Sequence, residues 1–347
     1  MNAPDEPIAL DRTPAVTVLM PVHQAAATLD EALAGLFAQT LADWELVAVD
    51  DGSTDGSGAL LARAAGRDAR VRVLTRPHRG IVAALNAGLA AARAPLVARM
   101  DADDRMAAER LAVQVDAARC HPDWAVVGCR VSMFPEAALT DGMRHYRDWL
   151  NGVLTPGDVA RDIWVESPLA HPSVLFRRDA VAAVGGYREG PFPEDYDLWL
   201  RLHAAGHAMG KVDRELVAWR EGPGRLSRTD PRYAPAAFRA LKAHHLARSV
   251  LAGRHEVQLW GAGPDARAWR NALAAEGIRV ARFFDIDPRK IGRTLGDGAP
   301  VLDWRRTPEF RGTPLLCAVG QKGARTRMRG LLAAMDFVEG RDHWFVQ

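Results

Sequence analysis

A cluster of carboxylates directly after an apolar stretch is the feature that most constrains this chain. Residues 94–98 (Ala-Pro-Leu-Val-Ala) predict a buried strand, and the run Arg99-Met100-Asp101-Ala102-Asp103-Asp104 follows at once. Carboxylate oxygens gathered at a strand end favour a hard divalent cation such as Mg²⁺ or Mn²⁺. One Asp-x-Asp is weak support by itself, because a solvated loop of aspartates is the alternative.

Strand and helix patterns alternate through the first hundred or so residues, which favours a parallel sheet covered by helices. A capping box, Thr28-x-x-Glu31, predicts the start of the first helix. Ligands of open α/β sheets bind outside the carboxyl ends of the strands, so the segments at those ends should converge on one crevice. The strands are expected at 16–20, 45–49, 71–75 and 96–100, the helices at 28–39, 55–65 and 80–93, and the converging segments are Pro21-Val22-His23, Asp50-Asp51 and Asp101–Asp103.

The pattern becomes mixed after residue 107, and a second unit begins near Glu256. In that unit Gly261-Ala262-Gly263 follows a predicted strand, with Ala266 and Asp285 at positions that loosely fit a dinucleotide fingerprint. Cofactor binding is one interpretation, and a packing, oligomerisation or docking domain is the other. We expect a flexible N-terminus at 1–13, an α/β domain at 14–230, a helical connector at 231–254 and a small Rossmann-like α/β domain at 255–347.

Composition excludes several classes of protein. The net charge is only +2, so nothing global indicates a nucleic-acid partner. The three cysteines form no Cys-x-x-Cys pair, which argues against zinc and against a disulfide framework and fits a reducing cytoplasm. We see no signal peptide and no apolar run of the ~18 residues that a membrane span needs. Arginines 325, 327 and 329 are expected on a solvated helix face, with contact to anionic lipid head groups as the alternative.

The ordered set of motifs over residues ~14–230 resembles an inverting family 2 glycosyltransferase of GT-A fold. The resemblance rests on the acidic segments and strand ends above and on three later motifs. These are His171-Pro172-Ser173, Gly185-Gly186-Tyr187-Arg188 and Glu194-Asp195-Tyr196-Asp197-Leu198-Trp199. It implies a mixed sheet flanked by helices, a nucleotide-sugar donor, Mn²⁺ or Mg²⁺ as cofactor, and a glycan or lipid-linked hydroxyl acceptor.

The resemblance also implies roles for single residues. Asp195 would be the catalytic base, Asp103 with Asp101 would bind the metal, and Asp51 would accept from the ring N–H of a uridine-type base. His23-Gln24 stands where the family often has an aromatic residue followed by Asn, so stacking on the base can differ here. The expected nucleotide-sugar contacts are Pro21, Val22, His23, Asp51, Arg79, Asp101, Ala102 and Glu194.

Asp195 begins a predicted helix at 194–205, and a helix N-terminus would keep its carboxylate ionised. We expect a hexosyltransferase that works in the cytoplasm, with peripheral contact at the inner face of the membrane and a homodimer both left open. UDP is the favoured donor nucleotide, and dTDP offers the same ring N–H. The rival hypotheses are an NAD(P)- or nucleotide-binding oxidoreductase or sensor that works through the glycine turn at 261–263, and an inert sugar-nucleotide-binding module.

Overall fold

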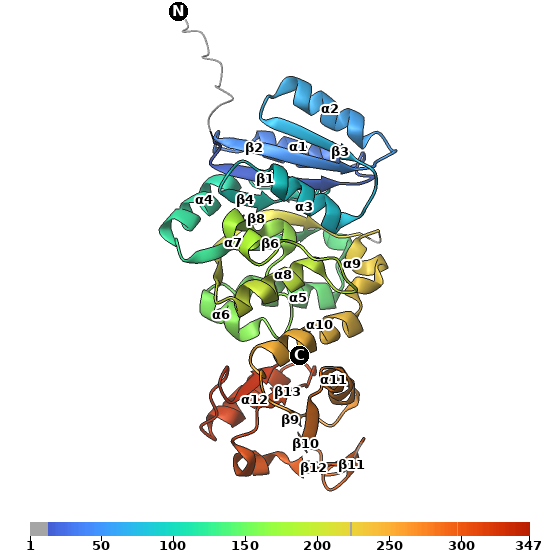
Figure 1. The fold of residues 1–347 in the computed structure, drawn as a ribbon, viewed down its shortest axis with the longest axis vertical. Coiled ribbons are helices and arrows are strands. Elements are labelled where there is room, and N and C mark those ends of the chain that lie inside the picture. The colour runs from blue at the N-terminus through green and yellow to red at the C-terminus, as the bar shows by residue number, and fades with distance from the viewer. Residues whose placement is uncertain (1–12, 223, 297) are drawn as a thin grey trace, which may run out of the picture. The chain divides into compact units, whose positions relative to one another are not determined.

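The computed structural model describes residues 13–222, 224–296 and 298–347 (Figure 1). The chain divides into two compact units, and neither is a single chain segment. The first comprises residues 13–152, 169–187 and 208–221, and the second comprises the described residues within 153–168, 188–207 and 222–347. The domain boundaries expected near residues 230 and 254 stay predictions.

The first unit is built on a mixed eight-stranded sheet with the order β3-β2-β1-β4-β7-β6-β8-β5. Strands β1 to β4 run parallel, whereas β7 is antiparallel to both of its neighbours. The expected mixed sheet is therefore confirmed. Its strands are β1 (Val16–Val22), β2 (Trp44–Asp51), β3 (Val71–Arg76), β4 (Leu96–Arg99), β5 (Arg105–Met106), β6 (Trp124–Phe134), β7 (Leu175–Arg177) and β8 (Ala208–Arg220).

Among the described residues, six helices and two 3-10 turns accompany this sheet, and the first three helices begin and end within a few residues of the positions expected for them. Helix α3 packs on β1 and β2, where Gly88 lies so close to the sheet that an added Cβ would meet the Leu19 side chain. The helices are α1 (Leu29–Phe37), α2 (Ser57–Arg67), α3 (Ile81–Ala91), α4 (Arg110–Cys120), α5 (Asp141–Gly152) and α7 (Arg178–Ala183), and the turns are η1 (Glu136–Ala138) and η2 (His171–Ser173).

Two features differ from expectation. The capping box at Thr28 is wrong, because the Thr28 hydroxyl donates to the carbonyl oxygens of Ala25 and Ala102, while Glu31 pairs with arginines. Strand β8 was not expected at all. Exposed charges at 213–215 interrupt its apolar pattern, and they coincide with register shifts against β6. A bulge places consecutive residues outside the ladder, so alternation fails there.

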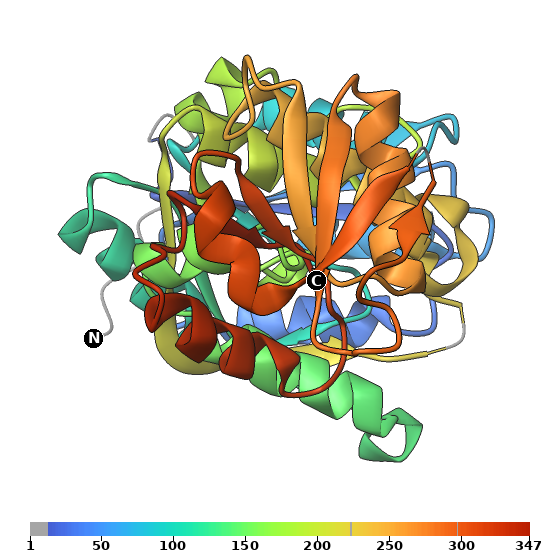
Figure 2. The ribbon, with the colours of Figure 1, turned by 90° about the horizontal axis from the view of Figure 1, so that it is seen from below.

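The second unit contains a six-stranded sheet with the order β11-β12-β10-β9-β13-β14, shown in orange and red in Figure 2. The five strands from β12 to β14 run parallel in the order typical of a Rossmann-like sheet, and β11 is antiparallel at the edge. The strands are β9 (Glu256–Trp260), β10 (Arg279–Asp285), β11 (Thr294–Leu295), β12 (Ala299–Asp303), β13 (Leu315–Cys317) and β14 (His343–Phe345).

The helices of the second unit include α8, which carries the expected acidic motif, and α10, which lies within residues 231–254; the connector expected there stays a prediction. No helix among the described residues is both long and apolar enough to span a bilayer. The helices are α6 (Pro156–Asp162), α8 (Glu194–Ala204), α9 (Leu226–Thr229), α10 (Pro235–Arg248), α11 (Pro264–Ala275) and α12 (Ala324–Ala333), and the 3-10 turns are η3 (Pro231–Tyr233) and η4 (Trp304–Phe310).

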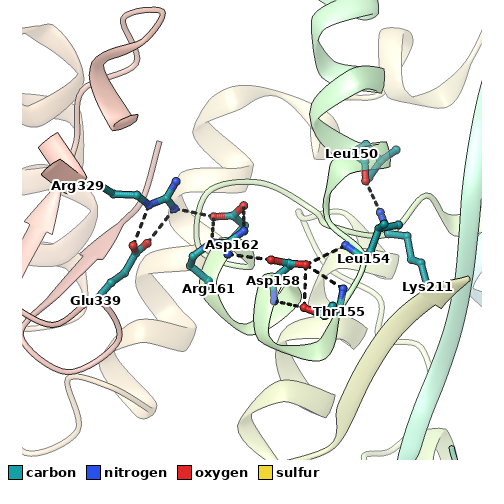
Figure 3. Close-up of polar contacts among 9 residues, drawn as sticks. All are labelled: Leu150, Leu154, Thr155, Asp158, Arg161, Asp162, Lys211, Arg329 and Glu339. Atoms are coloured by element: carbon teal, nitrogen blue, oxygen red, sulfur yellow. Dashed lines mark hydrogen bonds and ion pairs between the residues drawn. The ribbon is translucent and has the colours of Figure 1, made fainter. Parts of the chain in front are cut away.

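Arg329 of α12 forms ion pairs within the second unit and does not lie on a fully solvated helix face. Its guanidinium donates to Asp162 at 2.9 Å and to Glu339 at 2.8 Å and 2.9 Å (Figure 3). Asp162 is buried, so this ion pair compensates a carboxylate that has left water. The arginine is therefore accounted for by contacts within the chain.

Candidate functional site

Three acidic residues gather in the loop that follows β4. The carboxylate oxygens of Asp101, Asp103 and Asp104 lie within 4.8 Å of one another. Asp104 is buried, while Asp101 and Asp103 are partly exposed. An all-oxygen set at this spacing fits Mg²⁺ or Mn²⁺, and the partly exposed side leaves room for the oxygens of a substrate.

The backbone and side chains of this loop are held from several elements. The Arg99 guanidinium is buried and pairs with the Asp101 carboxylate at 2.6 Å. The Thr28 hydroxyl donates to the carbonyl oxygen of Ala102 at 3.1 Å, and the backbone N–H of Arg220 donates to Asp104 Oδ1 at 2.7 Å. The loop is thereby connected to α1, β4 and β8.

Asp51, the last residue of β2, is a second anchor at the same edge of the sheet. Its carboxylate is buried and accepts hydrogen bonds from the backbone N–H groups of Arg79 at 3.0 Å and Gly80 at 2.9 Å. His78 Nδ1 lies 2.8 Å from Asp51 Oδ2. The carboxylate expected to recognise a base therefore also holds the turn before α3 in place. The Arg79 side chain is exposed.

Two imidazole rings lie against Asp51. His23 Nδ1 is 3.0 Å from the Asp51 carbonyl oxygen, and the His23 ring stacks on His78 with centroids 4.1 Å apart and planes 22° from parallel. Ligand atoms of the three residues lie within 4.8 Å of one another. A metal ion between two stacked rings would lie outside both ring planes, away from the nitrogen lone pairs. The cluster thus fits hydrogen bonding better than metal binding.

The expected strand ends do lie side by side. Strand β1 is hydrogen-bonded to β2 on one side and to β4 on the other, with Val22 opposite Asp50 and Leu19 opposite Arg99. Pro21, Val22 and His23 therefore lie between the Asp51 anchor and the acidic loop. Asp50 accepts from the backbone N–H of Ser53 at 2.9 Å, which is a turn contact rather than an exposed ligand.

Glu194 and Asp195 belong to the second unit, at the first two positions of α8. Asp195 is partly exposed, and its Oδ1 lies 2.8 Å from the backbone nitrogen of Tyr196. Glu194 is buried and accepts a hydrogen bond from the Tyr233 hydroxyl at 2.6 Å. Burial, together with the neighbouring carboxylates, raises the pKa of Tyr233 above its usual value, so the hydroxyl stays a donor.

His171, from the motif His171-Pro172-Ser173, is buried in the first unit. Its Nε2 lies 2.8 Å from the hydroxyl of Tyr187, and the Tyr187 backbone is held by Asn86. Burial lowers the pKa of His171 well below its ordinary value, and the charge of Arg99 lowers it further. A neutral, hydrogen-bonded core histidine fits these contacts.

In the second unit, the glycine turn at 261–263 is hydrogen-bonded to Asp285 of the same chain. Asp285 Oδ2 accepts from the backbone N–H of Ala262 at 2.9 Å and from Lys290 Nζ at 3.0 Å. Asp285 Oδ1 accepts from the backbone N–H of Asp287 at 2.9 Å. The carboxylate that a dinucleotide would need for its ribose is thus engaged internally, which favours the packing interpretation of this unit.

Sequence reasoning missed three residues of this site: His78, Arg99 and Arg220. His78 directly precedes the turn that Asp51 holds. Arg99 carried a usable signal, because a charged residue at the end of an otherwise apolar strand needs a buried partner. Arg220 lies in the strand that was not expected, and no local signal connects it to residues more than a hundred positions earlier.

Comparison with known proteins matches this chain to glycosyltransferases. The model of the family described as glycosyl transferase family 2 matches residues 17–185. The amylovoran biosynthesis glycosyltransferase AmsE of Erwinia amylovora is 33% identical over 196 residues, which cover 56% of this chain and 71% of that protein. The glycosyltransferase EpsE of Bacillus subtilis is 30% identical over 226 residues, which cover 64% of this chain and 78% of that protein.

Among solved structures, S. aureus TarS 1-349 in complex with UDP-GlcNAc has a TM-score of 0.55 at 15% identity, covering 75% of this chain and 71% of that one. The mixed sheet flanked by helices is the fold of the GT-A glycosyltransferases. The chain belongs to glycosyltransferase family 2 and is therefore a glycosyltransferase.

Proposed function

We propose that this chain is an inverting glycosyltransferase that moves a sugar from a UDP- or dTDP-sugar to a hydroxyl acceptor. The observation that carries the proposal is the group of three carboxylates in the loop after β4, with ligand oxygens within 4.8 Å of one another. AmsE, a relative named for amylovoran biosynthesis, supports a role in cell-surface polysaccharide or glycoconjugate synthesis. TarS, which shares the fold, binds UDP-GlcNAc and supports a nucleotide-sugar donor.

Asp101 and Asp103 would hold Mn²⁺ or Mg²⁺. When bound, the ion supplies charge stabilisation to the diphosphate leaving group. The chain itself would orient the donor: the ends of β1 and β2, with Pro21, Val22 and His23, would face the nucleotide. The Asp51 carboxylate would accept from the ring N–H of uracil or thymine, a group that both bases share. Ala102 and Arg79 would complete the contacts of the donor.

Asp195 would act as the general base, with Glu194 beside it in contact with the donor sugar. As the acceptor hydroxyl attacks the anomeric carbon, its proton passes to the Asp195 carboxylate, and the bond to the diphosphate oxygen breaks. A single displacement of this kind inverts the anomeric centre. The first turn of α8 carries several backbone N–H groups that favour an ionised carboxylate there.

The acceptor would be a glycan or a lipid-linked hydroxyl. We further propose that the protein acts in the cytoplasm, contacts the inner face of the membrane peripherally and associates as a homodimer. Flotation with anionic vesicles and light scattering of the purified chain test these two points. A chain that stays monomeric and does not float would remove both from the proposal.

Calorimetric titration of the purified chain with UDP, dTDP, GDP and NAD, each with and without Mn²⁺, is the direct test. We expect Mn²⁺ to strengthen the binding of a pyrimidine nucleoside diphosphate, and we expect Asp103→Ala to lose this gain in affinity. Asp116→Ala, which removes an exposed aspartate of α4, is the control and should bind like the wild type. Binding of NAD alone, without metal, would overturn the proposal.

A further inference from the structure

Arg220, the last residue of β8, contacts two consecutive residues of the acidic loop. Its backbone N–H donates to Asp104 Oδ1 at 2.7 Å, and its Nε donates to the backbone carbonyl of Asp103 at 2.6 Å. The first contact orients the Asp104 carboxylate. The second orients the peptide that follows Asp103. One residue thus sets the direction of two neighbouring groups in the loop.

The rest of the Arg220 guanidinium is committed to other parts of the first unit. It forms an ion pair with Glu31 of α1, and it lies over the ring of Phe134, the last residue of β6, at 4.4 Å. Arg105 pairs with the same glutamate at 2.5 Å and lies over the same ring at 4.2 Å. The pKa of Glu31 is lowered, first by its hydrogen bond with Arg105, so the glutamate stays ionised beside both arginines.

These contacts separate two roles that an arginine near a diphosphate site can have. An arginine that binds phosphate presents its planar fork to the ligand. The Arg220 guanidinium instead contacts a carbonyl oxygen, a glutamate and an aromatic ring of this chain. Only 25% of the Arg220 side chain is exposed. Its effect on a bound cation would pass through the backbone of Asp103.

We propose that Arg220 is a positioning residue whose guanidinium holds the Asp103 peptide in the arrangement that binds the divalent cation. Its backbone N–H, which every substitution except proline keeps, continues to orient Asp104. The inference rests on the proposed function, in which Asp103 and Asp101 hold that ion. Groups one shell out from a metal orient its ligands, and their loss weakens metal binding about 10- to 100-fold. Lysine would not replace arginine here, because a single ammonium group cannot serve the carbonyl and the glutamate in the same fixed plane.

The test measures Mn²⁺ binding to the full chain from the electron paramagnetic resonance signal of free Mn²⁺, and UDP binding in EDTA by calorimetry. Arg220→Met and Arg220→Lys should both bind Mn²⁺ about 10-fold more weakly than the wild type, with UDP binding in EDTA unchanged. Arg214→Met is the matched control, because Arg214 lies in the same strand and pairs with Glu109 at the surface. It should leave both measurements unchanged.

Glu31→Gln provides a second route if the Arg220 variants fail to fold. It removes the charge that anchors the guanidinium, and we expect a smaller loss of Mn²⁺ affinity, about 3-fold, again without a change in UDP binding. Unchanged Mn²⁺ affinity in this variant and in Arg220→Met contradicts the inference. So does full Mn²⁺ binding by Arg220→Lys, which would mean that charge alone matters.

Weaker UDP binding in EDTA by Arg220→Met would show that Arg220 touches the nucleotide, and would also overturn the inference. These results leave the proposed function standing, because the wild type still binds Mn²⁺ and UDP. A wild-type chain that binds no Mn²⁺, with or without UDP, overturns the proposed metal site and this inference together.

Discussion

The carboxylate of Asp51, at the end of β2, accepts a hydrogen bond at 2.9 Å from the backbone N–H of Gly80, the residue that precedes α3. The adjacent N–H of Arg79 donates to the other oxygen of the same carboxylate at 3.0 Å. The Asp51 carboxylate thus holds the start of α3 in place. Changing Asp51 should therefore affect stability and ligand binding together.

Asp51→Asn should lower the free energy of unfolding by about 1–3 kcal/mol, because the amide group turns a donor toward a backbone N–H. UDP affinity should fall in the same variant. Urea unfolding and calorimetry measure the two effects. Asp30→Asn, which changes a largely exposed carboxylate, is the control and should be close to neutral. An Asp51 variant with unchanged stability would mean that the turn at 78–80 does not need this anchor.

Gly88→Ala should destabilise the first unit although alanine favours helices. An added Cβ at position 88 would lie 2.0 Å from Leu19 Cδ1 and 3.1 Å from Val49 Cγ2. Overpacking of this kind costs about 1–3 kcal/mol, against a gain of about 1 kcal/mol in helix propensity.

Gly66→Ala in α2 is the matched control, because an added Cβ there meets nothing within 4 Å. It should be neutral or stabilise the chain by up to about 1 kcal/mol. The melting temperature should fall in Gly88→Ala and should stay the same or rise in Gly66→Ala. A stabilised Gly88→Ala chain would show that α3 can move away from the sheet at little cost.

Asp195→Asn should reduce turnover by about 10²- to 10⁴-fold if its carboxylate is the general base, with UDP binding in Mn²⁺ unchanged. Release of UDP from a UDP-sugar, followed with and without candidate acceptors, measures turnover. Glu189→Gln is the control, because Glu189 is an exposed acid of the segment before α8 whose carboxylate lies 3.6 Å from the Arg232 guanidinium. Near-normal turnover in Asp195→Asn would assign the base to another residue.

Acid should destabilise the fold in part through His171. Burial lowers the pKa of this imidazole well below its ordinary value of 6.5, so the folded state holds it neutral. Below that ordinary value the unfolded chain binds one more proton than the folded chain. This destabilisation is therefore absent above about pH 6.5. Below that pH, the free energy of unfolding decreases by up to about 1.4 kcal/mol per pH unit as His171 of the unfolded chain takes up a proton.

His171→Gln should flatten this pH dependence by up to one proton between about pH 7 and about pH 5. Burial also lowers the pKa of His203 and of His343, so part of the acid sensitivity should remain in the variant. Urea unfolding at several pH values gives the two slopes. Parallel slopes for the variant and the wild type would mean that His171 is protonated in the folded state.

Much of this architecture follows from short-range patterns in the chain. The alternation of apolar runs with amphipathic segments predicted β1 to β4 and the helices between them, because a strand or a helix is specified by residues a few positions apart. The same patterns predicted that aspartates at 50–51 and 101–104 follow buried strands. Because neighbouring parallel strands end at one edge of a sheet, their convergence could be expected as well.

Contacts between distant segments were decided only by the tertiary structure. Strand β8 has charges in its middle that break alternation, and its pairing with β6 shifts register at that point. The hydrogen bond between Arg220 and Asp104 joins residues 116 positions apart, and that between Gly80 and Asp51 joins residues 29 apart. Local sequence determined which carboxylates end a strand. Packing alone decided which donors meet them, since a hydrogen bond forms only where the folded backbone brings its two atoms together.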